Sequence, residues 1–531
     1  MPELPPASSA LESIEVVLLI FAIAVAVSYL ARRTVITQPI LLLAAGVLLG
    51  LVPGLPRIEL EPDIVFALFL PPILFGAAYF TPIRDFRANA RPILLLAVGL
   101  VLFTTLVVGV VAHAMVPGMS VAAALTLGAI VAPPDAVSAT AIFRRLGVPR
   151  RIVTVLEGES LINDATSLIA YRAATAAALG VMSFSVLTST LEFLVIGLGG
   201  VLVGVVVGAI LTGLLRRTGD PQLEIAVTLI APATAYILAE RFGLSGVLAT
   251  VVAGFITGRR AARVLSPDAR LLGSGAWQIL LWGINAIVFM SIGLQLPAIL
   301  DGLSATPPDE LLRYAVLISL TVIVARFVWV FPATYLPRFL SRNIRERDPY
   351  PSPRQVVIVS WAGMRGVVSL AAALALTPDF PQRPLILYLT FCVIVATLVG
   401  QGLTLPWLIH VLGVTATGDG LEAEESHARQ IAVEAGLRRL EELREEYPTH
   451  LPLIDQIQED LEHELTHVAP GEDVTLDEAQ QEALDHRAIR VAVLVVQREA
   501  VIQLRDDGVI NDETLRRIEL ELDLEAVRTG S

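Results

Sequence analysis

The sequence predicts an all-α polytopic membrane protein with about 13 transmembrane helices, followed by an α-helical cytoplasmic tail. Its composition is the first reason, because 55% of the residues are hydrophobic and 17% are charged, whereas soluble domains contain about 25% charged residues. A series of apolar stretches, each long enough to cross a bilayer, is the second. The third is the charge distribution, since residues 1–417 carry a net charge of +5 and residues 418–531 carry −18.

This change of charge near residue 418 predicts two domains, a transmembrane domain (1–417) and an acidic helical cytoplasmic domain (418–531). Helical patterns cover 421–447 and 477–507, and prolines interrupt the tail at positions 448, 452 and 470. We interpret the tail as a solvated cap or dimerisation element, with an ion- or pH-sensing regulator as the alternative. An acidic tail argues against nucleic acid as a partner. The single Cys392 lies in an apolar run, which argues against disulfides and thiolate metal sites.

The expected spans are bounded by glycine, proline or arginine clusters, and the shortest of them is 244–258. In order they are 13–31, 35–52, 63–80, 92–115, 121–143, 152–179, 184–214, 222–239, 244–258, 273–299, 312–336, 355–377 and 385–412. An odd number of crossings places the two termini on opposite sides of the membrane.

Arginine in the loops predicts which side is which. Alternate loops contain 20 arginines, and the other set of loops contains four. Because loops rich in basic residues stay in the cytoplasm, the N-terminus is expected outside and the tail inside a plasma membrane of the bacterial inner-membrane type. No basic residue precedes the first apolar stretch, so we expect that helix to be uncleaved.

The fifth span contains the sequence Ala-Pro-Pro-Asp-Ala-Val at 132–137. Pro133 and Pro134 remove backbone donors, so the helix is expected to break there. Irregular backbone at membrane depth is tolerated where it lines a cavity, and its freed carbonyls are good ligands for a hard cation. Asp135 stands at this break.

The sixth span carries a polar stripe. Ser160, Asn163, Asp164 and Ser167 are spaced i, i+3, i+4 and i+7, which is one helix face. An ionised Asp at the centre of a membrane helix costs about 2.5–3.5 kcal/mol, so this face is expected to line protein or a water-filled cavity. Such a row of oxygen ligands indicates a site for a small cation or a proton.

Two arginines inside later spans are candidates to neutralise a buried carboxylate. Arg326 lies in the middle of the eleventh span, and we pair it with Glu159, which leaves Asp164 free to titrate. Snorkelling of Arg326 to the interface is the alternative. Arg365 lies in the Gly-Met-Arg-Gly segment 363–366 of the twelfth span, where the glycines predict a second break; it has the alternative role of a counter-charge to helix C-termini.

The two breaks fall in the fifth and twelfth spans, seven apart, as expected for a secondary transporter built of inverted repeats. Functionless kinks are the alternative for each break alone. Burial disfavours the charged form of a carboxylate, so a proton and a cation compete for the oxygens of Asp135 and Asp164. If the site opens to one side of the membrane at a time, this competition exchanges a cation for a proton across the membrane. The amide of Asn163 does not titrate, which favours a stoichiometry of one cation exchanged for one proton. The chain has no phosphate-binding loop, and we expect no nucleotide, no other cofactor and no enzymatic activity.

These motifs resemble those of the monovalent cation/proton antiporter family, which includes bacterial sodium/proton antiporters and animal sodium/proton exchangers. Segment 157–165 resembles the family's G-E-S-x-x-N-D signature, and segment 363–366 is similar to its G-x-R-G segment. The Asn163-Asp164 pair matches the electroneutral branch of the family. Pro134 and Ala136 stand where the family often has the threonine and second proline of S-P-T-D-P-V, so backbone coordination through Pro134 is retained but a hydroxyl is lost. The resemblance covers residues 13–412.

The resemblance implies an inverted-repeat antiporter fold with crossed broken helices, a dimerisation domain and a mobile core domain, working as a homodimer by an elevator-like motion. It implies that Na⁺ or K⁺ is bound by Asp135, Asp164 and Ser160, with Glu159 acting directly or through its pair with Arg326. Asn163 would hold the crossed helices in place.

We therefore predict an electroneutral Na⁺/H⁺ antiporter that serves pH homeostasis. K⁺/H⁺ exchange is the near alternative. A gated cation channel is the alternative from another class, and a membrane sensor signalling through the tail is a third.

Overall fold

In a computed structural model, every regular element in the described part of the chain is a helix. The described residues are 7–34, 36–52, 65–180, 186–303, 306–415 and 419–468, with 493, 496–497, 499–504, 507, 518, 522 and 525. The chain divides into two compact units, Met1–Ala416 and Thr417–Ser531. This division lies one residue from the boundary expected from the change of charge.

The first unit is a bundle of helices, several of them continuous through a short π-helical stretch (η1, η2 and η3). Its first half contains α1 (Ala7–Arg32), α2 (Gln38–Gly50), η1 (Val65–Phe69), α4 (Leu70–Phe80), α5 (Ile83–Ala88), α6 (Ala90–Leu94), η2 (Leu95–Leu100), α7 (Val101–Met115), α8 (Val121–Val131), α9 (Ala136–Leu146) and α10 (Arg150–Ala178). Its second half contains α11 (Val186–Thr218), α12 (Pro221–Arg241), α13 (Gly246–Val264), α14 (Pro267–Leu294), α15 (Leu296–Asp301), α16 (Pro308–Leu340), α17 (Arg342–Arg347), α18 (Pro353–Trp361), α19 (Val367–Leu374), α20 (Arg383–Val395), η3 (Ala396–Gln401) and α21 (Gly402–Leu412).

Each expected span coincides with one helix or with consecutive helices of this unit. Among the described residues, seven helical segments are long and apolar enough, by length and composition, to cross a membrane. The expected count of thirteen crossings stays a prediction. The shortest expected span, 244–258, corresponds to α13, which extends to Val264.

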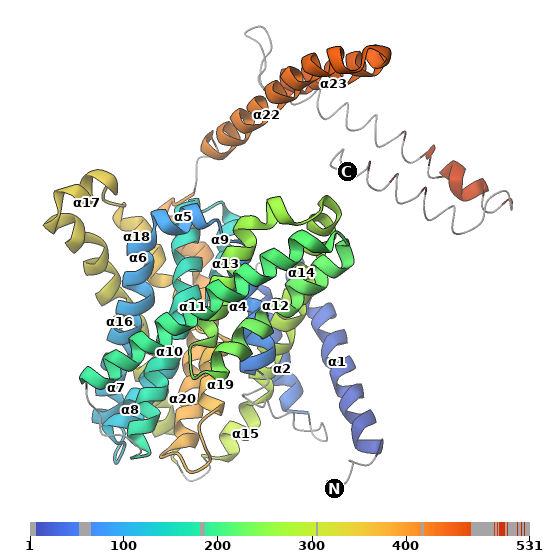
Figure 1. Cartoon of the computed structure of the whole chain (residues 1–531). Coiled ribbons are helices and arrows are strands. Elements are labelled where there is room, and N and C mark those ends of the chain that lie inside the picture. Colours follow the sequence, from blue (N-terminus) through green and yellow to red (C-terminus); the bar gives the residue numbers. More distant parts are fainter. Residues whose placement is uncertain are drawn as a thin grey trace. The chain divides into compact units, whose positions relative to one another are not determined.

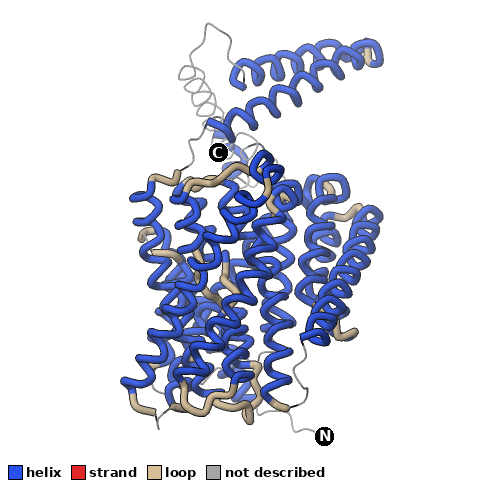
Figure 2. The backbone as a smooth tube through the Cα atoms, turned by 90° about the vertical axis from the view of Figure 1, so that its left-hand side faces the viewer, coloured by secondary structure: helices blue, strands red, loops and turns tan. Residues whose placement is uncertain are grey.

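Both predicted helix breaks are confirmed. Residues 132–135 separate α8 from α9, and residues 362–366 separate α18 from α19. Figure 2 shows such non-helical segments in tan inside the bundle as well as at its ends. The new helix α9 begins where Asp135 accepts a hydrogen bond from the backbone N–H of Val137 at 3.0 Å, which satisfies one of the unpaired donors of its first turn.

The largest apolar cluster of the unit surrounds the broken helices. Its buried side chains include residues of α8, α9 and α10 and, far along the chain, of α14, α16 and α18–α21, together with residues of α1, α2, α7 and α15. A second cluster joins α10 to η1, α4, α12 and α13. Helix α10 therefore packs against the broken helices on one side and against α4, α12 and α13 on another, which places its polar stripe in the interior.

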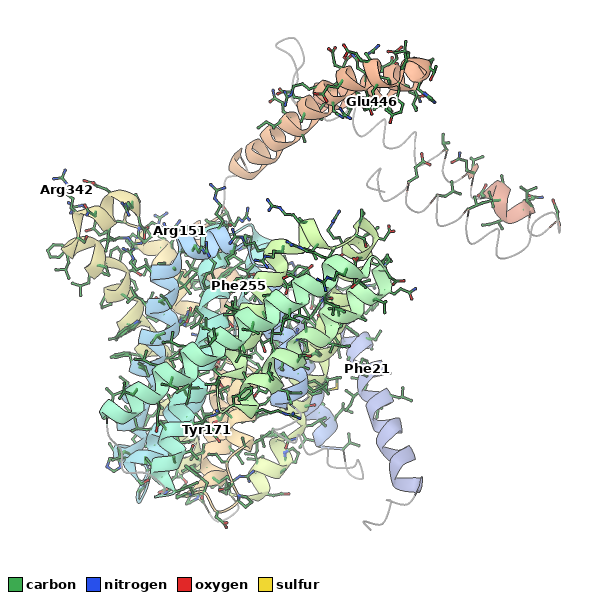
Figure 3. The ribbon with its side chains drawn as sticks, in the orientation of Figure 1. Phe21, Arg151, Tyr171, Phe255, Arg342 and Glu446 are labelled. Carbon is green, nitrogen blue, oxygen red and sulfur yellow. The ribbon has the colours of Figure 1, made fainter. Side chains whose placement is uncertain are left out.

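The arginine-rich connections lie together at one end of the bundle. Helices α5, α9 and α17 are at this end in Figure 1, and α15 is at the opposite end. Figure 3 likewise shows Arg151 and Arg342 at the first end and Tyr171 toward the other. The alternation of loop arginines along the sequence thus corresponds to a separation in space.

The second unit contains α22 (Asp419–Glu446), the 3₁₀ turn η4 (Pro448–His450) and α23 (Leu451–Val468). Val433, Leu440 and Ile454 are buried in it. The expected interruption at 448 is present, but Pro452 does not break the run as we expected. It lies in the first turn of α23, where a residue without an N–H loses no hydrogen bond. Pro470 and most of the expected helix 477–507 lie outside the described residues.

Candidate functional site

The two broken segments cross each other and bond directly. The backbone N–H of Asp135, at the first break, donates to the carbonyl of Met364, at the second, with an N···O distance of 2.6 Å. From the second break, Nε of Arg365 donates to the carbonyl of Val131 at 3.1 Å. These bonds join residues more than two hundred positions apart and satisfy backbone groups that the breaks leave without helical partners.

Glycine permits this close crossing. A Cβ atom at Gly366 would lie 2.6 Å from Oδ2 of Asp135, and one at Gly363 would lie 2.5 Å from Cδ of Arg326 and 2.9 Å from a terminal nitrogen of Arg365. Any other residue would force the surrounding charged side chains to move. The two glycines are therefore required for the approach of the chains as well as for the break.

The polar stripe of α10 holds the first break in place. The side-chain amide of Asn163 donates to the carbonyl of Pro134 at 2.9 Å, and the hydroxyl of Ser167 donates to the carbonyl of Ala129 at 2.8 Å. The hydroxyl oxygen of Ser160 accepts from the backbone N–H of Ala136 at 3.4 Å. Both Asn163 and Ser167 are buried. Three of the four stripe residues thus bind the freed ends of α8 and α9.

Asp135 and Asp164 are brought together at the crossing. Asp164 is buried, and the two carboxylates interact electrostatically. Asp135 is half-buried. Because its Oδ1 accepts from the first turn of α9, Oδ2 is the oxygen that faces the second break at Gly366.

Glu159 and Arg326 form the predicted ion pair. The two terminal nitrogens of Arg326 donate to the two oxygens of Glu159 at 2.6 and 2.8 Å, and Nε donates to the carbonyl of Val359 at 3.2 Å. Arg326 is 0% exposed and Glu159 1%. This bidentate geometry excludes snorkelling of Arg326 to the interface. Each oxygen of Glu159 thus accepts one hydrogen bond from Arg326.

Arg365 contacts backbone carbonyls, and its role stays a prediction. Its guanidinium donates to the carbonyls of Val131, the last residue of α8, and of Gly363. It therefore places a positive charge at a helix C-terminus, where the helix dipole is negative. Its backbone N–H donates to Oγ1 of Thr397 at 3.0 Å.

Thr397 is a site residue that the sequence reasoning missed. It is fully buried, lies in the π-helical stretch η3, and also donates from Oγ1 to the carbonyl of Val393 at 2.7 Å. A hydroxyl within an apolar span was the available signal, but threonine commonly bonds its own helix, so the signal is weak. Its contact with the second break depends on the tertiary fold.

The crossing thus brings together several oxygen atoms of the kind that bind hard cations. They are the carboxylates of Asp135 and Asp164, the hydroxyl of Ser160 and the carbonyl of Pro134, which keeps a second lone pair beyond its bond to Asn163. Such oxygens are the ligands of hard cations, and the carboxylates also accept protons. This arrangement suits a small monovalent cation and a proton that compete for the same atoms.

The chain is similar to known ion exchangers. A family model described as "Sodium/hydrogen exchanger, transmembrane" matches residues 17–411. The chain is 34% identical, over 526 residues, to an uncharacterized Na⁺/H⁺ exchanger of Mycobacterium tuberculosis, with 97% of this chain and 95% of that protein covered. It is also 34% identical to the sodium, potassium, lithium and rubidium/H⁺ antiporter of Bacillus subtilis, over 74% of this chain and 61% of that protein.

The fold is similar to a solved structure, the sodium proton antiporter MjNhaP1 from Methanocaldococcus jannaschii. The TM-score is 0.61 and the sequence identity is 19%, with 76% of this chain and 99% of the other chain covered. At this identity the likeness concerns the fold alone.

Proposed function

This chain belongs to the sodium/hydrogen exchanger family, and we propose that it exchanges Na⁺ for protons across a membrane, one ion for one proton. It is a multi-pass membrane protein of a transporter family rather than of an enzyme class. Its transported ions are substrates, and the gradient of one drives the movement of the other.

The charge of the buried cluster is the observation that carries the one-for-one exchange. Glu159 and Arg326 neutralise each other in their ion pair. Of the remaining groups, Arg365 contributes one positive charge, and Asp135 and Asp164 contribute two negative charges. The cluster therefore has a net charge of −1 when both aspartates are ionised. One monovalent cation or one proton neutralises it, and binding both would leave an uncompensated positive charge in a low-dielectric interior.

The roles of the residues follow from this balance. We propose that Asp164 and Asp135 supply the charged ligands, and that the Ser160 hydroxyl and the Pro134 carbonyl complete the coordination. Asn163 holds the carbonyl of Pro134 in position, and Arg365 and the Glu159–Arg326 pair set the charge. A cation leaves when a proton arrives on one side, and the reverse occurs on the other side after the site changes its access.

K⁺/H⁺ exchange is the second candidate. The name of the Bacillus subtilis relative includes sodium, potassium, lithium and rubidium; its identity to the chain is the same 34%, over 74% of the chain instead of 97%. Pro134 offers a carbonyl where a threonine hydroxyl is common in relatives, so the coordination shell differs at that point. A gated cation channel is a weaker candidate, because the chain belongs to a family of exchangers.

We further propose that residues 1–417 form the transport domain, with dimerisation and core parts, and that the chain works as a homodimer in a bacterial inner membrane. The arginine-rich end of the bundle supports a cytoplasmic orientation for that end, with the N-terminus outside. The acidic unit that follows would then be cytoplasmic.

Exchange in proteoliposomes tests the proposal. Purified protein is reconstituted into acid-loaded vesicles containing a pH dye, and external Na⁺ is expected to release internal protons. Asp164→Asn keeps the shape of the side chain and removes its charge, so it is expected to abolish the release. Asp309→Asn, at an exposed position at the start of α16, is the matched control and should keep it.

Three results would contradict this proposal. Sodium-driven proton release that survives in Asp164→Asn would refute the site. Release that requires a clamped membrane potential would refute the one-for-one exchange. K⁺ acting at lower concentration than Na⁺ would favour the second candidate.

A further inference from the structure

One carboxylate at the arginine-rich end of the bundle binds three arginines. Asp348, just after α17, accepts from Arg91 and Arg151 at 2.5 Å each and from Arg338 at 2.7 Å. Arg338 also donates from Nε to the backbone carbonyl of Asp348 at 3.0 Å. Burial raises the pKa of Asp348, but hydrogen bonds from Arg151 and Arg338 outweigh it and bring that pKa below its ordinary value of 3.8. Three positive charges on one negative charge leave a net charge of +2.

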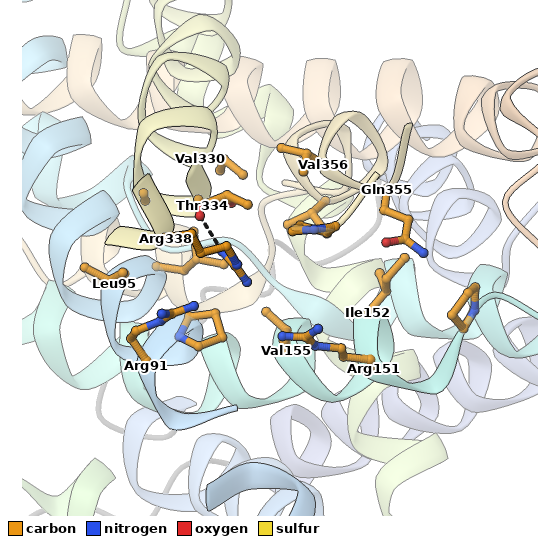
Figure 4. A pocket seen from close by; sticks show the side chains of 16 residues that line it. Arg91, Leu95, Arg151, Ile152, Val155, Val330, Thr334, Arg338, Gln355 and Val356 are labelled. Carbon is orange, nitrogen blue, oxygen red and sulfur yellow. Dashed lines mark hydrogen bonds between the residues drawn. The ribbon is translucent and has the colours of Figure 1, made fainter. Parts of the chain in front are cut away.

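These three arginines line a cavity of about 110 Å³ (Figure 4). This is roughly the volume of three or four water molecules, at ~30 Å³ each. Most of the other walls are apolar, and they include Leu95, Val155, Val330 and Val356. The cavity therefore combines an excess of positive charge at its rim with a hydrocarbon-like interior.

The cavity lies where membrane-spanning segments end. Arg91 is near the beginning of the apolar segment Ala90–Met115, and Arg338 is near the end of the apolar segment Pro308–Leu340. Phe339 and Leu340, the next residues along α16, are 74% and 73% exposed. Large apolar side chains beside a cluster of arginines are characteristic of the boundary between acyl chains and headgroups.

The three arginines are not equivalent. The side chain of Arg338 is 3% exposed and holds Asp348 by two bonds, whereas those of Arg91 and Arg151 are 29% and 48% exposed and hold it by one bond each. An incoming anion would therefore meet Arg91 and Arg151 first, while Arg338 and Asp348 stay bonded. A basic pocket between helices, open at the headgroup level, suits an anionic lipid.

We propose that this pocket is a binding site for an anionic phospholipid. Its phosphate binds the guanidinium groups of Arg91 and Arg151, and part of an acyl chain fills the apolar cavity. The phosphodiester carries one negative charge, which lowers the excess charge of the cluster from +2 to +1, and the apolar walls of the cavity contact hydrocarbon.

The bound lipid would stabilise the helices that carry the buried ion pair. Val155 lies one turn before Glu159 on α10, and Val330 lies one turn after Arg326 on α16. Val359, whose carbonyl accepts from Nε of Arg326, also lines the cavity. The lipid would thus connect α6, α10, α16 and α18 around that pair.

Thermal unfolding and lipid retention test this proposal without any transport measurement. The full chain is placed in nanodiscs of phosphatidylcholine, with or without phosphatidylglycerol, and bound lipid is counted by native mass spectrometry. Phosphatidylglycerol is expected to raise the melting temperature of the wild type. Arg91→Gln with Arg151→Gln should abolish the rise and lower lipid affinity about fivefold for each arginine, since one such residue near a membrane surface is worth about 1 kcal/mol.

Matched variants distinguish lipid binding at this pocket from a general attraction of anionic lipid to surface arginines. Arg216→Gln with Arg217→Gln removes two exposed arginines from α11, away from the cavity, and should keep the full effect of phosphatidylglycerol. Asp348→Asn removes the internal competitor for Arg91 and Arg151, so it should retain more lipid than the wild type. If the double pocket variant fails to fold, Arg151→Gln alone, at the most exposed of the three positions, serves instead.

Several outcomes would overturn the proposal. Equal melting temperatures in the two kinds of nanodisc would do so, as would an equal loss in the Arg216/Arg217 control. The same stabilisation by inorganic phosphate in phosphatidylcholine nanodiscs would show a site for a free anion instead of a lipid. Reduced lipid retention in Asp348→Asn would show that Asp348 builds the site rather than competing for it.

Discussion

Arg326→Met tests the energetic role of the buried ion pair. Methionine is long enough to fill most of the space of the arginine stem, so the change removes the charge without opening a large cavity. It leaves Glu159 buried, with both carboxylate oxygens deprived of their partners. Breaking a buried pair on one side costs about 3–5 kcal/mol, because the remaining charge keeps its desolvation penalty.

The companion variant removes both charges. Replacing a buried ion pair with apolar residues of similar size is commonly neutral or stabilising, so Glu159→Leu combined with Arg326→Met should lose less stability than Arg326→Met alone. An exposed pair gives the matched control, because its acidic residue, Glu157, lies on the same helix as Glu159. Arg144, 71% exposed, bonds Glu157 at 2.8 Å, and Arg144→Met should cost less than about 1 kcal/mol.

The free energy of unfolding can be measured by tryptophan fluorescence during a detergent titration in mixed micelles. The pattern expected is a large loss for Arg326→Met, a smaller loss for the double variant and almost none for Arg144→Met. If the single and double variants lose the same amount, the cost does not come from an unpaired Glu159. A loss for Arg326→Met no larger than that of the control would show that the pair contributes little.

Three further changes test other contacts of the fold. Gly366→Ala should disrupt exchange, because its Cβ would lie 2.6 Å from a site carboxylate, whereas Gly275→Ala, with no heavy atom within 4 Å, should be silent in the vesicle assay. Thr397→Val should cost about 1–3 kcal/mol of unfolding free energy by leaving the buried N–H of Arg365 unpaired, and Thr397→Ser should restore it. The pKa of Asp348 lies below 3.8 in the folded chain, so its carboxylate stabilises the fold above that pH and loses this effect as the pH falls. The difference in melting temperature between wild type and Asp348→Asn should therefore be constant from about pH 5 to 8 and shrink below about pH 4; a difference that already shrinks near pH 6 would contradict the low pKa.

The positions of the helix breaks were predictable because their causes are local. Pro133 and Pro134 lack the N–H groups that would continue α8, and the glycines at 363 and 366 tolerate backbone that other residues do not. The partnership of Glu159 and Arg326 was predictable for a different reason. An ionised side chain at membrane depth requires a neutralising partner, and few candidates of opposite charge exist inside the spans.

Contacts that depend on long-range packing could not be predicted in the same way. Arg365 had two plausible roles, and only the crossing of the two breaks shows that its guanidinium binds the end of α8 rather than a carboxylate. Thr397 carried no distinctive pattern. The cluster around Asp348 joins residues from three separate stretches of chain, and each stretch has by itself the composition of an ordinary charged loop.

The sequence by itself therefore determined the membrane class, the helix breaks and the polar face of α10, and it indicated the chemical type that we propose for the site. These properties arise from composition and from periodicity within single helices, where a few neighbouring residues decide the outcome. Only the tertiary structure decided that the two breaks cross, which oxygens lie near one another, and which charged groups surround the proposed site. Those facts depend on how helices far apart in the chain pack, because charge balance at a buried site is a sum over every group within reach.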